Sequence, residues 1–104
     1  MLLANARTTT GSDGWMKQDL ADTAISAQGN TSSGVGSVTV VIEASEDGVV
    51  ALLSPIGIIT LTLGTTPVAD GFVMKARWNY IRARVSAISG TGATVSAETS
   101  LKDR

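Results

Sequence analysis

The chain has 104 residues and a net charge of −1, with 16% charged, 43% hydrophobic and only 4% aromatic residues. This length fits one domain whose core is built mainly from Val, Ile, Leu and Ala. The chain contains no histidine and no cysteine. Their absence excludes disulfides, Ser-His-Asp and Cys-His nucleophilic catalysis, and the usual zinc and iron–sulfur ligand sets.

Residues 1–22 are predicted to form an N-terminal arm without a core of its own. Its apolar tip contains Leu2 and Leu3, and Arg7 follows shortly after. A run of Thr, Gly, Ser and Asp then leads to Trp15, and such a run has turn chemistry without hydrophobic periodicity. The tip is expected either to dock on a neighbouring subunit or to fray as a free terminus.

The region 23–99 shows the alternation of apolar and polar residues that is typical of half-buried strands. A first strand is expected from residue 23, and the Gly- and Ser-rich stretch 29–36 is predicted to be a loop. The clearest strand of the first half covers 38–44. Its predicted core face consists of Val38, Val40, Ile42 and Ala44.

Turn residues divide the middle of the chain. Asp47-Gly48 predicts a type I′ hairpin turn, because both central positions of that turn need a positive φ. The chain should then return as a strand over 49–53. Further strands are expected from residue 58 to residue 63 and from residue 72 to residue 77.

The most regular strand is predicted over 80–87, followed by a Gly-rich connection and a last strand over 93–99. The total is about seven short strands, which predicts an all-β antiparallel sandwich or jelly roll over 23–99, with 100–104 as a C-terminal tail. The core face of the strand over 80–87 is expected to carry Ile81, Ala83, Val85 and Ala87, and the opposite face Tyr80, Arg82, Arg84 and Ser86.

Every charged residue between positions 72 and 97 is a cation. Arg82 and Arg84 therefore have three interpretations: contact with phosphate or nucleic acid, pairing with an acid such as Glu43, or simple solvation. Only one aromatic residue, Tyr80, shares their face, which is too few for a base-stacking platform. This argues against nucleic acid as a partner, as does the overall charge.

Carboxylates are the remaining candidates for chemistry. Asp19 with Asp22, or Glu43 with Glu46 and Asp47, could form a glycosidase pair, but acids that precede glycine at turns usually have a local structural role. No calcium loop or phosphate-binding glycine motif is present. We therefore predict a protein that is not an enzyme and has no cofactor or metal.

The low charge predicts that part of the surface is covered by copies of the chain or by another protein. The longest apolar stretch, 49–64, is interrupted by polar residues and a proline. It is too short and too polar to span a bilayer, so no membrane partner is expected.

Three segments carry a resemblance to a known group of proteins, namely GSVTVVIEASEDG at 36–48, DGF at 70–72 and WNYIRARVSAISGTGATV at 78–95. Through these segments the chain resembles small β-sandwich proteins encoded in the structural gene clusters of tailed bacteriophages. The resemblance covers about residues 36–97. Many such proteins carry a Trp soon after the Asp-Gly turn, but Val49-Val50-Ala51 stands here, which weakens a sugar-binding role.

The resemblance implies a virion structural protein, most concretely a head decoration or cement protein that binds and stabilises the major capsid shell. Its partners would be the major capsid protein and copies of itself, with a trimer favoured. Its location would be the capsid surface of a virion assembled in the host cytoplasm. The alternatives are a tail, fibre or neck component, or a carbohydrate-binding module using Trp15 or Trp78. The predicted partner-binding residues are Leu2, Leu3, Arg7, Trp15, Tyr80, Arg82 and Arg84.

Overall fold

The computed structural model describes residues 2–12, 14–17, 23–51, 55–74 and 79–100, which contain nine strands and no helix. All strand pairs are antiparallel, as predicted. The strands are β1 (Leu2–Arg7), β2 (Gly11–Ser12), β3 (Met16–Lys17), β4 (Thr23–Asn30), β5 (Ser33–Ser45), β6 (Gly57–Leu63), β7 (Val68–Met74), β8 (Tyr80–Thr91) and β9 (Thr94–Ser100).

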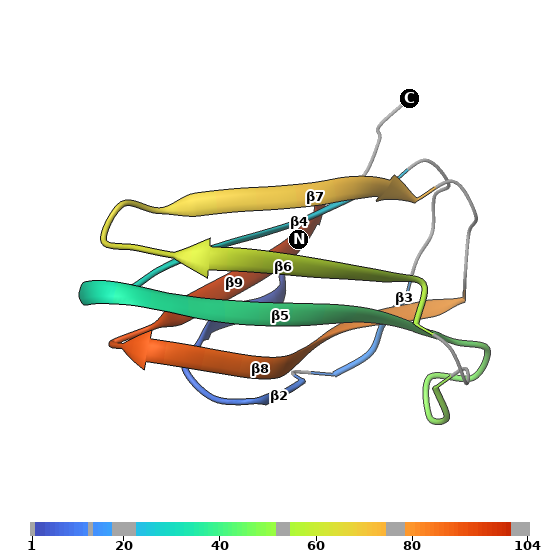
Figure 1. Cartoon of the computed structure of the whole chain (residues 1–104). Helices are drawn as coiled ribbons and strands as arrows, with labels where there is room; N and C mark the ends of the chain where they lie inside the picture. Colours follow the sequence, from blue (N-terminus) through green and yellow to red (C-terminus); the bar gives the residue numbers. More distant parts are fainter. Residues whose placement is uncertain (1, 13, 18–22, 52–54, 75–78, 101–104) are drawn as a thin grey trace.

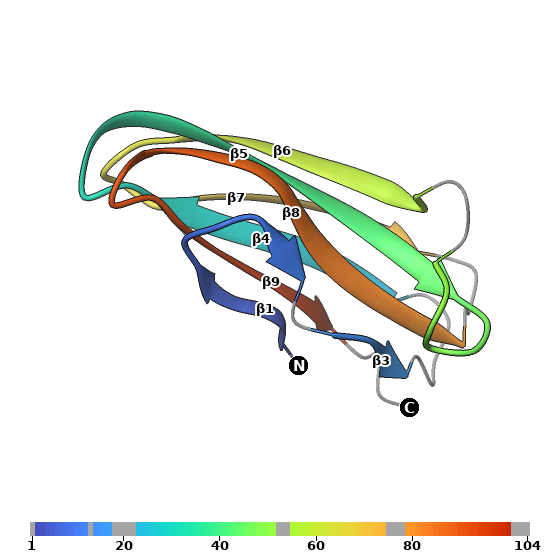
Figure 2. The same ribbon diagram turned by 90° about the horizontal axis from the view of Figure 1, so that it is seen from below.

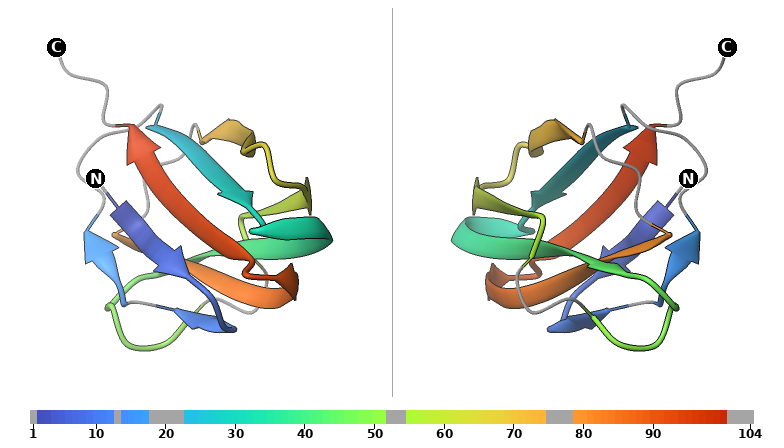
Figure 3. Two further views of the ribbon diagram at one scale, coloured as in Figure 1. Left: turned by 90° about the vertical axis from the view of Figure 1, so that its left-hand side faces the viewer. Right: turned by 90° about the vertical axis from the view of Figure 1, so that its right-hand side faces the viewer.

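The strands form two sheets (Figure 1). Sheet A has the order β1-β9-β4-β7, and sheet B has the order β2-β8-β5-β6, with β3 also paired to β8. Seen along the molecule, β4 and β9 lie side by side in one layer and β5 and β8 in the other (Figure 3). The chain therefore alternates between two layers instead of completing one sheet before starting the next.

The first half of the chain pairs with the second half in reverse order. β1 pairs with β9, β2 and β3 pair with β8, β4 pairs with β7, and β5 pairs with β6. Two further pairs, β4 with β9 and β5 with β8, join these nested hairpins into the two sheets. The β5–β6 connection is consequently the innermost turn of one long folded hairpin.

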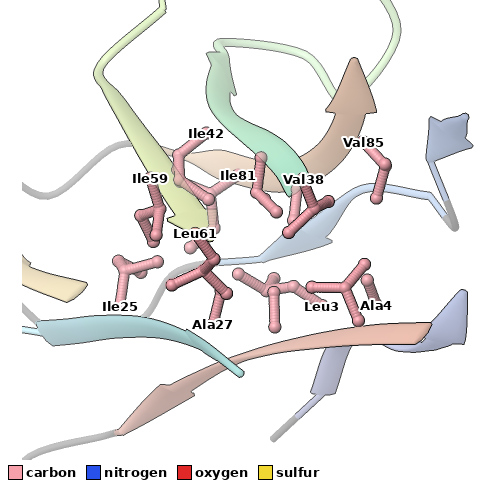
Figure 4. Packing of buried hydrophobic residues seen from close by; sticks show 14 of the residues in the cluster. Leu3, Ala4, Ile25, Ala27, Val38, Ile42, Ile59, Leu61, Ile81 and Val85 are labelled. Atoms are coloured by element: carbon pink, nitrogen blue, oxygen red, sulfur yellow. The ribbon is translucent and has the colours of Figure 1, made fainter. Parts of the chain in front are cut away.

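One hydrophobic core lies between the sheets, as Figure 4 shows for ten labelled side chains. The predicted face of β5 is fully buried from Val38 to Ala44, so the two-residue alternation located this strand correctly. Gly57 has no Cβ where the ring of Phe72 lies, and this aromatic ring packs against the core from β7. All other residues of the core cluster are aliphatic or Met16, as the composition predicts.

The segment expected to be an arm belongs to the sheets. β1 pairs with β9 at the edge of sheet A, and Leu3 and Ala4 are buried in the core. β2 and β3 extend sheet B beside β8 (Figure 2). The segment lacks a regular alternation because β1 has two register shifts and β2 and β3 have two residues each. Residues 13 and 18–22 and the tail 101–104 lie outside the described residues.

Several predicted boundaries differ from the structure, among them the start of β7, at Val68 instead of residue 72, and the end of β8, at Thr91 instead of residue 87. The stretch 29–36 is mostly strand, because β4 continues to Asn30 and β5 begins at Ser33. The return strand over 49–53 is not formed in its described part, where only Ala51 makes an isolated bridge, to Ser45. Asp47-Gly48 is not a type I′ turn either, because Gly48 has a φ of 75° whereas Asp47 is not among the residues with positive φ.

The face assignment of Ala87 is wrong because β8 contains a register shift. Thr39 pairs with Ala87 and Val40 with Val85, so Ser86 is an extra residue on β8. One extra residue moves every later side chain to the opposite face. Ala87 is accordingly exposed, and Ile88 packs against the core instead.

Candidate interaction surfaces

The predicted cationic face of β8 is largely paired within the chain. The Arg82 Nε lies 2.7 Å from Glu43 Oε1, and the Arg84 Nε lies 3.3 Å from Glu43 Oε2. The register explains the contact, because Glu43 stands directly opposite Arg82 on the neighbouring strand β5. Of the three interpretations of these arginines, pairing with Glu43 is the one that the structure supports.

Trp15 belongs to the same cluster. The guanidinium carbon of Arg82 lies 4.3 Å from the centre of the Trp15 ring, a cation–π geometry. β3 begins directly after Trp15 and pairs with β8, which brings the indole over the outer face of sheet B. Arg82 thus contacts Glu43 and Trp15 and has a side chain only 24% exposed, whereas that of Arg84 is 41% exposed.

The other predicted binding residues have different places. Leu3 is buried in the core of its own chain, and Leu2 pairs with Glu98 in the ladder between β1 and β9. Arg7 donates from Nη2 to the carbonyl of Thr10 at 3.0 Å, so its side chain supports the turn before β2. The structure therefore joins Trp15, Arg82 and Arg84 in one cluster but places Leu3 in the core. Trp78 lies outside the described residues.

The apical loop, residues 46–50, is the most conspicuous surface feature that sequence reasoning missed. It projects from the end of the molecule where β5 finishes (Figure 1). Its two neighbouring valines, Val49 and Val50, are 75% and 66% exposed. The sequence signal for this loop is the Val-Val pair directly after Asp-Gly. The prediction assigns that pair to the start of a strand instead of to a loop.

The loop is held by two side-chain oxygens. The buried Ser45 hydroxyl donates to the Val50 carbonyl at 2.6 Å and accepts from the Gly48 amide at 3.0 Å. Asp47 Oδ1 accepts the amides of Val49 and Val50 at 2.9 and 3.0 Å. The ring of Tyr80 lies against Gly48, and the Asn79 amide donates to the Glu46 carbonyl at 3.1 Å. The exposed valines therefore stand on an ordered base.

The Asp47 carboxylate is stabilised by these bonds. The backbone amides of Val50 and Val49 donate to this carboxylate and hold the pKa of Asp47 below its ordinary value of 3.8. A carboxyl whose folded pKa is lowered stabilises the folded loop above the unfolded pKa, and this contribution is lost as the pH falls through the folded pKa. The loop should therefore keep one conformation at neutral and mildly acidic pH.

A pH titration followed by NMR tests this expectation. Between about pH 7 and about pH 5 the amide signals of Val49 and Val50 should not move, and below pH 3.8 they should shift together. The Asp47→Asn variant should show no such step, because its amide does not titrate. A titration midpoint at or above 3.8 in the unmodified chain would mean that these amides do not stabilise the Asp47 carboxylate.

The outer face of sheet A carries a small polar hollow of about 190 Å³. It lies over the paired strands β4, β9 and β7. Its volume is below the range of about 300 to 1,000 Å³ that is typical of small-molecule sites. The lining residues are Ser26, Ala27, Gln28, Ala69, Ser96 and Glu98.

Within the described ranges, no three His, Cys, Asp or Glu side chains gather in a way that could hold a metal ion. The described part of the chain also has no helix long and apolar enough to cross a membrane. Comparisons with protein-family models, with curated proteins and with solved structures found no match to this chain.

Proposed function

We propose that this chain is a structural subunit of a virion, most concretely a head decoration protein that binds the major capsid protein and stabilises the shell. The observation that carries the proposal is the apical loop, in which Val49 and Val50 stand exposed on a hydrogen-bonded base. Exposed apolar groups on an ordered loop are typical of protein contact sites. Because the loop is already ordered, little conformational entropy is lost on binding.

The proposed architecture is a jelly-roll β-sandwich. The nested antiparallel pairing and the strand orders β1-β9-β4-β7 and β2-β8-β5-β6 support it, with β2 and β3 together occupying one strand position. Jelly rolls are frequent among viral capsid and lectin domains. A fold alone does not define a function, so this likeness supports the proposal only together with the apical loop.

The proposed mode of binding is insertion of the two valines into an apolar depression on the capsid protein. Full burial of a valine side chain contributes roughly 1.5 to 3 kcal/mol. Glu46 and Asp47 precede the valines, so a depression with Lys or Arg at its rim would complement the loop. Arg84, which is half-exposed on the face of sheet B, offers a second contact of opposite charge.

The proposal also includes contact with copies of the same chain, in the trimer that the resemblance implies. The proposed location is the capsid surface, after assembly in the host cytoplasm. The mass of the chain in solution tests the trimer, and imaging of particles tests the location. No catalytic step, cofactor or metal is part of the proposed role.

Replacing Val49 and Val50 with serine together should weaken binding to the shell at least about 100-fold, because the apolar groups of two valines no longer leave water on binding. The measurement is co-sedimentation of the purified chain with shells assembled from the major capsid protein of the same source. Both valines are largely exposed, so the thermal midpoint of the variant should change little.

Val35→Ser is the matched control. Val35 is 77% exposed but lies near the start of β5, at the other end of that strand from the apical loop. This variant should co-sediment as well as the unmodified chain. Failure of the unmodified chain to bind shells, or equal binding by the Val49 and Val50 double variant, would contradict the proposal.

A tail, fibre or neck subunit remains the first alternative, and imaging of intact particles distinguishes it by location. The carbohydrate-binding alternative is favoured by one observation, the polar hollow with Glu98 and Gln28 on sheet A. Trp15 does not support it, because its ring is in contact with Arg82. Shell binding that survives loss of both valines, together with saturable glycan binding, would favour this alternative.

A further inference from the structure

Among the described residues, β6 forms the outer edge of sheet B and pairs with a strand on one side only, β5. An edge strand presents unpaired backbone N–H and C=O groups along its free side, and natural proteins usually protect such edges with charges, proline, bulges or very short strands. β6 has none of these protections within its seven residues, GIITLTL, and its pairing with β5 shows no register shift.

The other described edge strands are protected. β1 has two register shifts and ends at Arg7, and β2 and β3 have two residues each. β7 carries the exposed acid Asp70 in its middle. Among the strands that the structure describes, β6 is therefore the long, regular and uncharged edge.

The side chains of β6 are arranged almost symmetrically about Thr60. A second β6 running antiparallel and centred on Thr60 would place Ile59 opposite Leu61 on the buried face, and Ile58 opposite Thr62 on the exposed face. Threonine would face threonine at the centre, a favourable cross-strand pair. The burial pattern agrees, because residues 59, 61 and 63 are buried and residues 58, 60 and 62 are exposed.

From these observations we infer that β6 is a self-association edge, through which two copies of this chain join their B sheets into one continuous antiparallel sheet. The contact is isologous, with a twofold axis at Thr60, so each strand satisfies the free backbone groups of the other. It also covers Ile58, which is 58% exposed in the single chain. The inference does not depend on the proposed virion function, and it is an alternative to the trimer that the resemblance implies, because a contact on a twofold axis joins two chains.

The tests use the full chain and its native mass over a range of concentrations. The unmodified chain should have the mass of two chains. Thr60→Lys and Thr60→Glu should each weaken the pair at least about tenfold, because like charges would meet at the axis. Mixing the two variants should restore a pair that contains one chain of each, since lysine then faces glutamate.

Ser86→Lys is the control, because Ser86 is exposed on β8, two strands away from the β6 edge. It adds the same charge and should leave the pair intact. Circular dichroism verifies that each variant keeps its strand content. A single-chain or three-chain mass for the unmodified protein, or no mixed pair from the Lys and Glu variants, would overturn the inference.

Discussion

Replacing Ile42 with alanine is expected to lower the free energy of unfolding by about 3 to 5 kcal/mol. Ile42 is completely buried in the C-terminal half of β5, between the two sheets. Its neighbours across the two ladders are Ala83 and Gly57, which have too little side chain to fill the space that is left. The paired strands hold the backbone in place, so the cavity should persist and add its cost to the lost transfer free energy.

Chemical denaturation of the variant and of the unmodified chain measures this loss. Domains of this size are typically stable by about 5 to 15 kcal/mol, so the variant should lose a large fraction of its stability. Val35→Ala truncates an aliphatic side chain on the same strand but at a position that is 77% exposed. It should change the free energy of unfolding by less than about 0.5 kcal/mol. Equal effects of the two variants would contradict the assigned core.

The sequence predicts the position and the core face of a strand wherever one face of that strand is buried. The alternation along 38–44 and along Ile81, Ala83 and Val85 corresponds to side chains that are almost fully buried. A period of two identifies such strands because successive side chains point to opposite faces. The all-β class with antiparallel pairing followed from these segments and from the turn residues between them.

The alternation of apolar and polar residues does not predict which face a side chain occupies where the pairing of two strands is irregular. The reason is that the alternation contains no information about which residues of the two strands stand opposite each other. The extra residue at Ser86 shifts the remainder of β8 by one position, and no residue type marks that shift in advance. The same limit applies to β1, whose bulged pairing with β9 is set by contacts between the two ends of the chain. Such contacts cannot be read from local sequence, so this segment was predicted to be a free arm.

The candidate surfaces were predictable only in part. The pairing of Arg82 and Arg84 with Glu43 was among the expected alternatives, since charged residues in adjacent strands often face each other. The apical loop was not predicted, because its order depends on the hydroxyl of Ser45 and the carboxylate of Asp47 turning back to bind local backbone groups. Asp-Gly indicated a turn, but a longer loop formed instead of a two-residue hairpin.

Replacing Ser45 with alanine is expected to cost about 1 to 3 kcal/mol in the free energy of unfolding. The Ser45 hydroxyl is fully buried, donates to the Val50 carbonyl and accepts from the Gly48 amide. Alanine fits the space but leaves these two backbone groups without a partner at the base of the apical loop. The loop should therefore also lose order, which hydrogen exchange of the Val49 and Val50 amides would detect as faster exchange.

Ser37→Ala separates this effect from the general loss of a serine on β5. The Ser37 hydroxyl is exposed and bonds to the Ser89 hydroxyl at 3.1 Å, so water can replace that bond. Its removal should change the free energy of unfolding by less than about 0.5 kcal/mol and leave exchange at Val49 and Val50 unaltered. If the Ser45 variant behaves in the same way, the valines are not held by Ser45, and the bonds from the Val49 and Val50 amides to Asp47 alone keep the loop ordered. If the Ser45 variant instead binds shells more weakly while both valines are still present, then the order of the loop contributes to affinity separately from its apolar surface.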